Sequence, residues 1–481
     1  MERQVPDIFK AIILLGMFGI TPVIGFLIRN SQRGQRIAFG LMCFMTTGGI
    51  LGASEWGLTL SAFEYRSHAR GFHFYFICLP ALAIIFAKIF TRWRDVKLVP
   101  PGFWLFYTFC VCACMSIVTA EFPTYVLMAA WKTVELTVIG IAAYNFIRTD
   151  RDLKFLIHCM ACTMAWQFVV ALKMKYLDGI YQVYGTFEHQ NSLSTFTTMI
   201  GLVFLGAALA PKEEKSNWFM WVYIFCAFIV QSALSRGSLF TFALGSVIVV
   251  VLSLVDRVTK RRMTVLVALA AVAAVGLAFT MDTLMARFKG DERYNEESKH
   301  TRDMLNQASR NMVAEHPLGV GWNNYGRMIN HPYHYGDHID AYQKKWSNQI
   351  DPNYQKGISE SLYYLILAEN GYLSLVVYVA FFALFLIMNL RGAMTFRTDM
   401  IGGFSIGLFA GCGVIYLQSF LERVLTQPRN MALWFLLLGA AARIETWRRK
   451  EAHLRKQPLP ELSQFERDEL SSLSEPVSAG R

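Results

Sequence analysis

The sequence is dominated by a succession of apolar stretches, each about as long as a helix that crosses a bilayer. A spanning α-helix needs about 20 mainly apolar residues because the hydrocarbon core is roughly 30 Å thick. Hydrophobic residues make up 54% of the 481 positions and charged residues only 17%, a balance that is rare in a soluble chain of this size. Thirteen such stretches occur, at 8–28, 37–54, 71–90, 102–120, 124–147, 154–173, 192–210, 217–234, 237–255, 263–281, 361–390, 399–420 and 429–445. The sequence therefore predicts an all-α, polytopic integral membrane protein with about 12–13 transmembrane helices.

Lysines and arginines gather in the connections at alternate ends of these stretches. The basic clusters are Arg29, Arg33 and Arg36; Arg92, Arg94 and Lys97; Arg148, Arg151 and Lys154; Arg257, Lys260, Arg261 and Arg262; and Arg443, Arg448, Arg449, Lys450, Arg455 and Lys456. Cytoplasmic loops of membrane proteins carry such an excess, so the net charge of +11 indicates topology and no nucleic-acid partner. The same rule puts 174–191, 235–236 and 282–359 on the external face, together with the N-terminus if every stretch spans.

The chain divides into four parts by composition. Residues 1–281 carry the N-terminal transmembrane helices, and 282–359 form a large, nearly charge-balanced periplasmic loop. The C-terminal transmembrane helices occupy 360–446. Residues 447–481 are rich in proline, serine and charged residues, so we expect a poorly ordered cytoplasmic tail.

The large loop contains a segment with helical periodicity. From His300 to Ala314, apolar side chains recur at the spacing of one helix face. This pattern predicts an amphipathic helix that lies against the membrane surface. A turn-forming sequence from 316 to 321 should end it.

Two groups of side chains have the composition, but not the spacing, of a metal site. Cys110, Cys112 and Cys114 alternate along one predicted helix and so point in different directions. His331, His334 and His338 lie in the loop without a compact zinc signature. We therefore predict no metal site and interpret the cysteines as buried apolar residues.

Polar residues interrupt the apolar pattern at two places on the predicted external face. His189 and Asn191 immediately precede a spanning helix, where they could cap its first amides or contribute to a site. Arg236 separates two apolar stretches. It could extend to the interface from a helix end, but its planar fork also suits phosphate oxygens, and we favour an anion contact.

Further charged residues lie in and after the loop. Arg302 and Arg310 belong to the amphipathic segment, and each could simply face solvent. Glu360 begins the helix that follows the loop. An acid in the first turn is favoured by the helix dipole, but a carboxylate beside arginines could equally accept a proton from a sugar hydroxyl.

Together these residues resemble the bacterial O-antigen ligase and Wzy-type polysaccharide polymerase superfamily, over about residues 100–445. The resemblance rests on Ser235-Arg236-Gly237, on Arg302 before the turn Pro317-Leu318-Gly319-Val320-Gly321, and on Glu360-Ser361 followed by Gly371. In that family the last motif normally starts with histidine, and Glu360 occupies this position here. Ser374 likewise stands where glycine, threonine or tyrosine is usual.

The resemblance implies an inverting, metal-independent and cofactor-free glycosyl transfer on the periplasmic face of the bacterial inner membrane. The donor glycan would be carried on undecaprenyl diphosphate, and the acceptor would be a glycan or glycolipid. Arg236 and Arg302 would hold the diphosphate and stabilise its developing charge. Glu360 would deprotonate the acceptor hydroxyl in place of the histidine, unless a histidine of the loop reaches the site or the chemistry is altered. A polysaccharide export machinery is a further expected partner.

Six more residues on this face are expected to bind substrate: His189, Asn191, Arg310, Trp322, Asn323 and Tyr364. Loop aromatic residues such as Trp322 could stack on sugar rings or anchor the loop at the interface. Polymerase and ligase differ only in the acceptor, and polymerisation is our working expectation.

Two other functions are compatible with the sequence. A glycolipid transporter or flippase would show internal repeats and charges near the membrane midplane, which we do not see. A catalytically idle subunit that binds a glycan within an export complex would explain the missing histidine.

Overall fold

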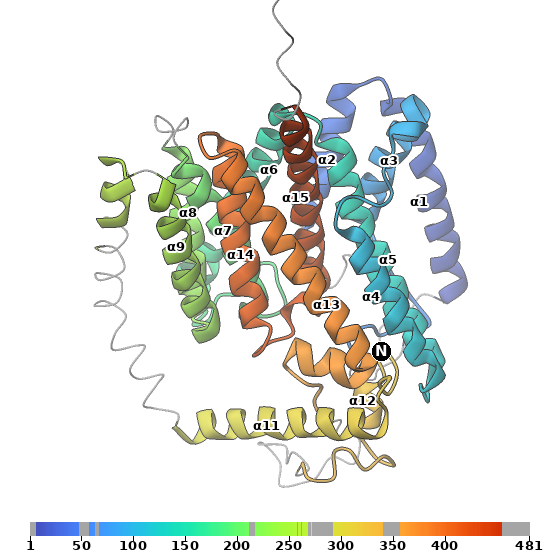
Figure 1. The fold of residues 1–481 in the computed structure, drawn as a ribbon. Helices are drawn as coiled ribbons and strands as arrows, with labels where there is room; N and C mark the ends of the chain where they lie inside the picture. The colour runs from blue at the N-terminus through green and yellow to red at the C-terminus, as the bar shows by residue number, and fades with distance from the viewer. Residues whose placement is uncertain are drawn as a thin grey trace, which may run out of the picture.

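The computed structural model describes residues 6–47, 57–62, 67–210, 217–256, 258–260, 262–267, 271, 292–339 and 356–454. The long helices are α1 (Asp7–Ile28), α2 (Gln32–Met45), α3 (Cys78–Arg92), α4 (Phe103–Met115), α5 (Pro123–Phe146), α6 (Asp150–Leu172), α7 (Gln190–Ala208), α8 (Trp218–Ala233), α9 (Arg236–Asp256), α11 (Glu292–Glu315), α13 (Leu362–Thr395), α14 (Met400–Gln418) and α15 (Pro428–Leu454). Short helices are η1 (Trp93–Asp95), η2 (Ser116–Val118), η3 (Lys173–Leu177), α12 (Tyr325–Met328) and η5 (Val424–Thr426). These α-helices form one bundle, except α11 and α12, which lie at one end of it (Figure 1).

The all-α, polytopic membrane fold is confirmed. Among the described residues, 7 helices are long and apolar enough to cross a membrane: α1, α5, α6 extended to Leu177, α7, α9, α13 and α14. The apolar helices α4 and α8 are shorter. Twelve of the thirteen predicted stretches coincide with described helices. The stretch 263–281 falls mainly outside the described residues.

One predicted helix starts later than the apolar pattern indicated. The stretch 71–90 opens with β2 (Phe72–Tyr75), which pairs antiparallel with β1 (Gly57–Leu60). Aromatic residues favour strands, and Thr59 Oγ1 lies 2.5 Å from His73 Nδ1 across the hairpin. The helix α3 therefore begins only at Cys78.

Glycines bring α7 and α14 into close contact. A Cβ atom on Gly206 would lie 2.2 Å from the carbonyl oxygen of Gly403, and one on Gly407 would lie 2.3 Å from that of Leu202. Small residues at such positions let two membrane helices approach backbone to backbone. Because the helices run in opposite directions, this contact holds the end of α14 near the start of α7.

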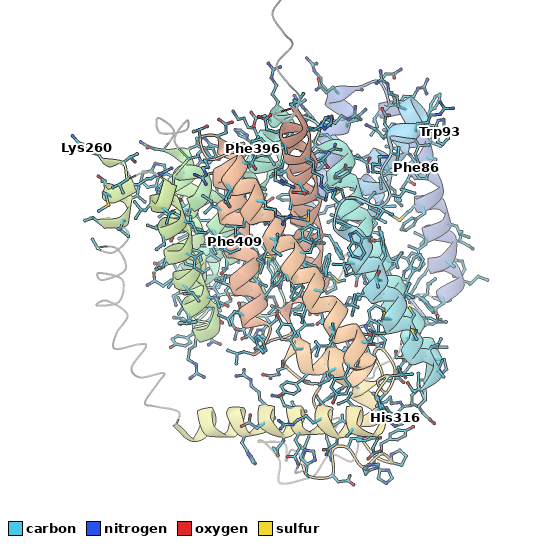
Figure 2. The ribbon with its side chains drawn as sticks, in the orientation of Figure 1. Phe86, Trp93, Lys260, His316, Phe396 and Phe409 are labelled. Atoms are coloured by element: carbon cyan, nitrogen blue, oxygen red, sulfur yellow. The ribbon has the colours of Figure 1, made fainter. Side chains whose placement is uncertain are left out.

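The bundle has two chemically different ends. Trp93, Lys260 and Phe396 lie at one end, and His316 lies beyond the other (Figure 2). Successive long helices alternate in direction, so the basic connections after α1, α3 and α5 share the first end, which we call the basic end. This arrangement agrees with the charge segregation expected from the sequence. The other end, crossed by α11, is called the α11 end (Figure 1).

The predicted amphipathic helix is present as α11. Its apolar residues Leu305 and Ala308 are buried in a cluster with Tyr325 of the loop and Leu365 of α13. Protein side chains therefore cover these residues, and the expectation that this face lies against the membrane surface was wrong. Packing on α13 fixes α11 relative to the bundle.

Candidate functional site

The structure brings Arg302 and Glu360 together across the α11 end. Arg302 lies on α11, and Glu360 lies two residues before α13 begins. Arg302 Nε donates a hydrogen bond to Glu360 Oε2. Both side chains are partly exposed, at 38% and 46%. Two residues that are 58 positions apart thus form one partly exposed ion pair.

A second carboxylate, Glu422, lies beside this pair. It belongs to the connection between α14 and α15, where Asn191 Nδ2 donates to its Oε1 at 2.8 Å and Gln418 Nε2 to its Oε2 at 3.1 Å. Burial raises the pKa of Glu422, and the charges of Arg302 and Glu360 act on it in opposite directions. The sequence analysis did not single out Glu422, because an acid in a short connection is usually part of a solvated turn.

The predicted Ser-Arg-Gly motif lies against the same carboxylate. Arg236 is the first residue of α9 and is partly buried. A Cβ atom on Gly237 would lie 3.7 Å from Glu422 Oε1, and Ser238 Oγ accepts a hydrogen bond from Gln418 Nε2 at 3.2 Å. The backbone of the motif is therefore part of the Glu422 surroundings.

The starts of α7 and α9 meet at this place. Ser194 Oγ of α7 donates to Ser238 Oγ of α9 at 2.8 Å. His189 is the N-cap of α7, and its Nδ1 accepts from Asn191 N at 3.2 Å. Partial burial lowers the pKa of His189, while Glu360 raises it. Helix N-termini attract anions, so two of them beside arginines make this region suited to phosphate oxygens. We call Arg236, Arg302, Glu360 and Glu422 the charged cluster.

The remaining motif residues have a structural role. The helix α13 is broken at Gly371, whose φ is 76° and ψ −179°. The turn that follows α11 docks on this break, where Val320 N donates to the Ala368 carbonyl at 2.9 Å. A Cβ atom on Gly371 would lie 2.2 Å from the Pro317 carbonyl oxygen. Glycine is needed here both for its positive φ and for this close approach.

Trp322 and Asn323 follow the turn and are buried. Asn323 Oδ1 accepts from Ser67 Oγ at 2.7 Å, and its Nδ2 donates to the Ala69 carbonyl at 2.7 Å. The Trp322 ring packs edge-on against Phe109, with 5.8 Å between centroids. These contacts join the loop to the hairpin region and the bundle. A substrate contact by either residue stays a prediction.

Arg310 and Tyr364 lie together where α11 meets α13. The guanidinium carbon of Arg310 is 5.8 Å from the centre of the Tyr364 ring. This distance is within the range of a cation–π contact. Their predicted substrate contact also stays a prediction.

The comparisons with known proteins agree with the motifs. The Wzy_C family model, described as O-antigen ligase, matches residues 221–379. This span includes Arg236, Arg302 and Glu360, so the resemblance inferred from the sequence is confirmed for that segment. It supports a membrane protein that ligates or polymerises glycans. No curated protein gives a significant match to the chain.

Proposed function

We propose that this protein is a membrane glycosyltransferase that transfers or polymerises a glycan from an undecaprenyl-diphosphate donor. The reaction takes place at the α11 end, on the periplasmic face of the bacterial inner membrane. The direct contact between Arg302 and Glu360 carries this proposal, because it joins an anion-binding group to a potential base. The O-antigen ligase match over residues 221–379 supports the same class of reaction.

The charged cluster supplies the groups that such a transfer needs. The acceptor hydroxyl gives its proton to Glu360, and its oxygen forms a bond to the anomeric carbon of the donor sugar. The bond from that carbon to the diphosphate oxygen breaks, and undecaprenyl diphosphate leaves with the electron pair. Arg236 and Arg302 stabilise the charge that develops on the leaving group. Attack from the opposite face inverts the anomeric carbon.

The ion pair suggests how the base becomes available. While Arg302 holds Glu360, its hydrogen bond occupies Oε2, one of the two carboxylate oxygens that could accept a proton. The oxygens of a diphosphate compete for the same guanidinium. Donor binding would therefore draw Arg302 to the leaving group and release Glu360 for the acceptor.

Glu422 is placed to position the other groups. It accepts hydrogen bonds from Asn191 and Gln418, and its charge acts on both Arg302 and Glu360. We assign it the role of a positioning residue that holds Arg302 near the leaving group and Asn191 near the substrate.

The location of the charges favours an enzyme over a transporter. Arg302, Glu360 and Glu422 all lie outside the spanning helices, at one end of the bundle. Transporters usually place such residues near the membrane midplane, between repeats.

Purified protein reconstituted in lipid nanodiscs tests the proposal. The donor is an undecaprenyl-diphosphate oligosaccharide with a fluorescent label on the sugar, offered with an unlabelled acceptor glycan. We expect label to appear on the acceptor together with free undecaprenyl diphosphate, and both products to form at least about a hundredfold more slowly with Glu360→Gln. Binding of the donor without either product would support the idle glycan-binding subunit instead. Movement of intact donor between leaflets would support the flippase.

A further inference from the structure

A cavity of about 580 Å³ lies next to the charged cluster and is not used by the proposed mechanism. Cavities of about 300–1,000 Å³ hold drug-sized ligands, a range that includes short oligosaccharides. Its wall is formed by Thr59, Ser67, His68, Ala69, Arg70, Gly71, His73, Tyr75, Lys132, Phe187, Glu188, Ser192, Arg423, Thr426, Gln427, Pro428 and Arg429. Two wall residues connect it to the cluster: Arg423 follows Glu422 in the chain, and Ser192 follows Asn191, which donates a hydrogen bond to Glu422.

The cavity wall is strongly basic. Four lysine or arginine side chains line it, namely Arg70, Lys132, Arg423 and Arg429, against the single carboxylate of Glu188. The charged cluster, in contrast, has two arginines and two glutamates. The cations come from three separate parts of the chain, namely Arg70, Lys132 and the pair Arg423 and Arg429, and the fold gathers them at one place.

Two of these cations are buried inside the protein. Lys132 is 4% exposed and Arg429 is 7% exposed. Lys132 Nζ donates to the carbonyls of His68 and Thr426, both at 2.6 Å, and these partners are neutral. Arg429 donates to the Thr186 carbonyl. Glu188 acts electrostatically on both cations, and Glu369 acts on Lys132, so these carboxylates compensate part of the buried charge. An anionic ligand in the cavity would add to that compensation.

The cavity extends from the surface to these buried groups. Arg70 and Glu188 are exposed, whereas Lys132 and Arg429 lie inside. Between them the wall presents the aromatic side chains of Tyr75 and Phe187 among hydroxyl groups. Hydroxyls bond to sugar hydroxyls, aromatic faces pack on sugar rings, and arginine forks bind carboxylates. This composition does not suit the hydrocarbon chain of the lipid carrier.

We infer that the cavity binds acidic sugars of the glycan, and that the substrates of this protein carry carboxylates. The inference rests on the proposed function, because it assigns the cavity to the glycan that the charged cluster transfers. The diphosphate of the donor offers the same anionic chemistry. The charged cluster already provides Arg236 and Arg302 for that diphosphate, so the cavity serves the sugar.

A binding measurement that needs no catalysis tests this inference. The probe is a fluorescent trisaccharide of hexuronic acid, titrated into protein in nanodiscs, with the matched neutral hexose trisaccharide as comparison. We expect binding of the acidic probe only. Arg70→Gln and Arg423→Gln should each weaken it about tenfold or more, the effect of losing a hydrogen bond to a charged group. Glu188→Gln should strengthen it, because a repelling carboxylate is removed.

Arg92→Gln is the matched control, since Arg92 is an exposed arginine at the basic end. Its affinity for the acidic probe should equal that of the wild type. Equal affinity for acidic and neutral probes, or no effect of Arg70→Gln and Arg423→Gln, would overturn the inference. The inference would also be overturned if Arg70→Gln and Arg423→Gln bound glycan-free undecaprenyl diphosphate more weakly than the wild type does. That result would mean that the cavity holds the diphosphate of the donor. Binding of the acidic probe by a protein that transfers no sugar would leave the cavity assignment in place and reject only the enzyme.

Discussion

Arg302 donates a hydrogen bond to Glu360, and this contact connects the large loop to the start of α13. Glu422 acts electrostatically on both partners. The pair thus lies in a cluster with two carboxylates, of which Glu360 is more exposed to an incoming acceptor. This arrangement leads to separate expectations for each member.

Glu360→Gln should reduce glycan transfer by about a hundredfold to ten-thousandfold, the usual contribution of a general base. The amide keeps the shape of the side chain but accepts no proton at neutral pH. Transfer rates of purified protein at equal abundance provide the measurement. Asp303→Asn is the control, because Asp303 is an exposed acid beside Arg302 on α11 and should tolerate the change. Full activity of Glu360→Gln would remove Glu360 from the reaction.

Arg302→Lys should lower the turnover number for transfer by about tenfold or more, because the ammonium keeps the charge but loses the planar fork. Initial rates over a range of donor concentrations separate turnover from donor affinity. Arg92→Lys, at the basic end, should behave as the wild type. If Arg302→Lys changes neither quantity, the guanidinium does not contact the leaving group.

Glu422→Gln should change how stability depends on pH. Burial raises the pKa of Glu422, so the folded protein binds this proton more tightly than the unfolded chain does. The free energy of unfolding therefore decreases as pH rises from the ordinary to the raised pKa. Glu422→Gln lacks the ionisable carboxyl. The free energy of unfolding of the wild type should therefore fall relative to that of the variant as pH rises from the ordinary to the raised pKa. Thermal unfolding from about pH 4 to about pH 7 checks this. A difference that stays constant with pH would contradict the assignment.

Gly371→Ala should destabilise the protein by more than about 1 kcal/mol, because alanine is strained at positive φ and its Cβ would meet the Pro317 carbonyl. Gly16→Ala in α1 is the control, since a Cβ atom there has no neighbour within 4 Å. Chemical denaturation of both variants in the same detergent gives the comparison. If Gly371→Ala were as stable as Gly16→Ala, docking of the turn at 316–321 would not depend on the break in α13.

A strain that lacks the gene should accumulate single lipid-linked repeat units without long chains, as expected for a polymerase. Mass spectrometry of the extracted lipid-linked glycans provides the measurement. Long chains that remain on the lipid carrier would identify a ligase instead.

The helical bundle could be predicted because a membrane requires long apolar helices, and their length is visible in the sequence. The hairpin of β1 and β2 could not, because Phe72–Tyr75 is as apolar as the start of a spanning helix. The apolar face of α11 was assigned to the membrane surface because periodicity shows that a face is covered but not what covers it.

For the candidate site, the motifs identified Arg236, Arg302 and Glu360 before any geometry was known. They could not reveal Glu422, whose role depends on Asn191, more than 200 positions away in the chain. The basic cavity was missed for the same reason. Its cations come from three distant parts of the sequence, and only the fold brings them together.

Sugar transfer by the purified protein in nanodiscs tests the central claim most directly. A labelled oligosaccharide on undecaprenyl diphosphate is incubated with acceptor glycan, and both products are quantified. The account predicts that labelled, extended glycan and free undecaprenyl diphosphate appear in equal amounts, and that Glu360→Gln forms both at least about a hundredfold more slowly. Donor that remains intact with the wild type, despite measurable binding, would contradict the assignment of this protein as a glycosyltransferase.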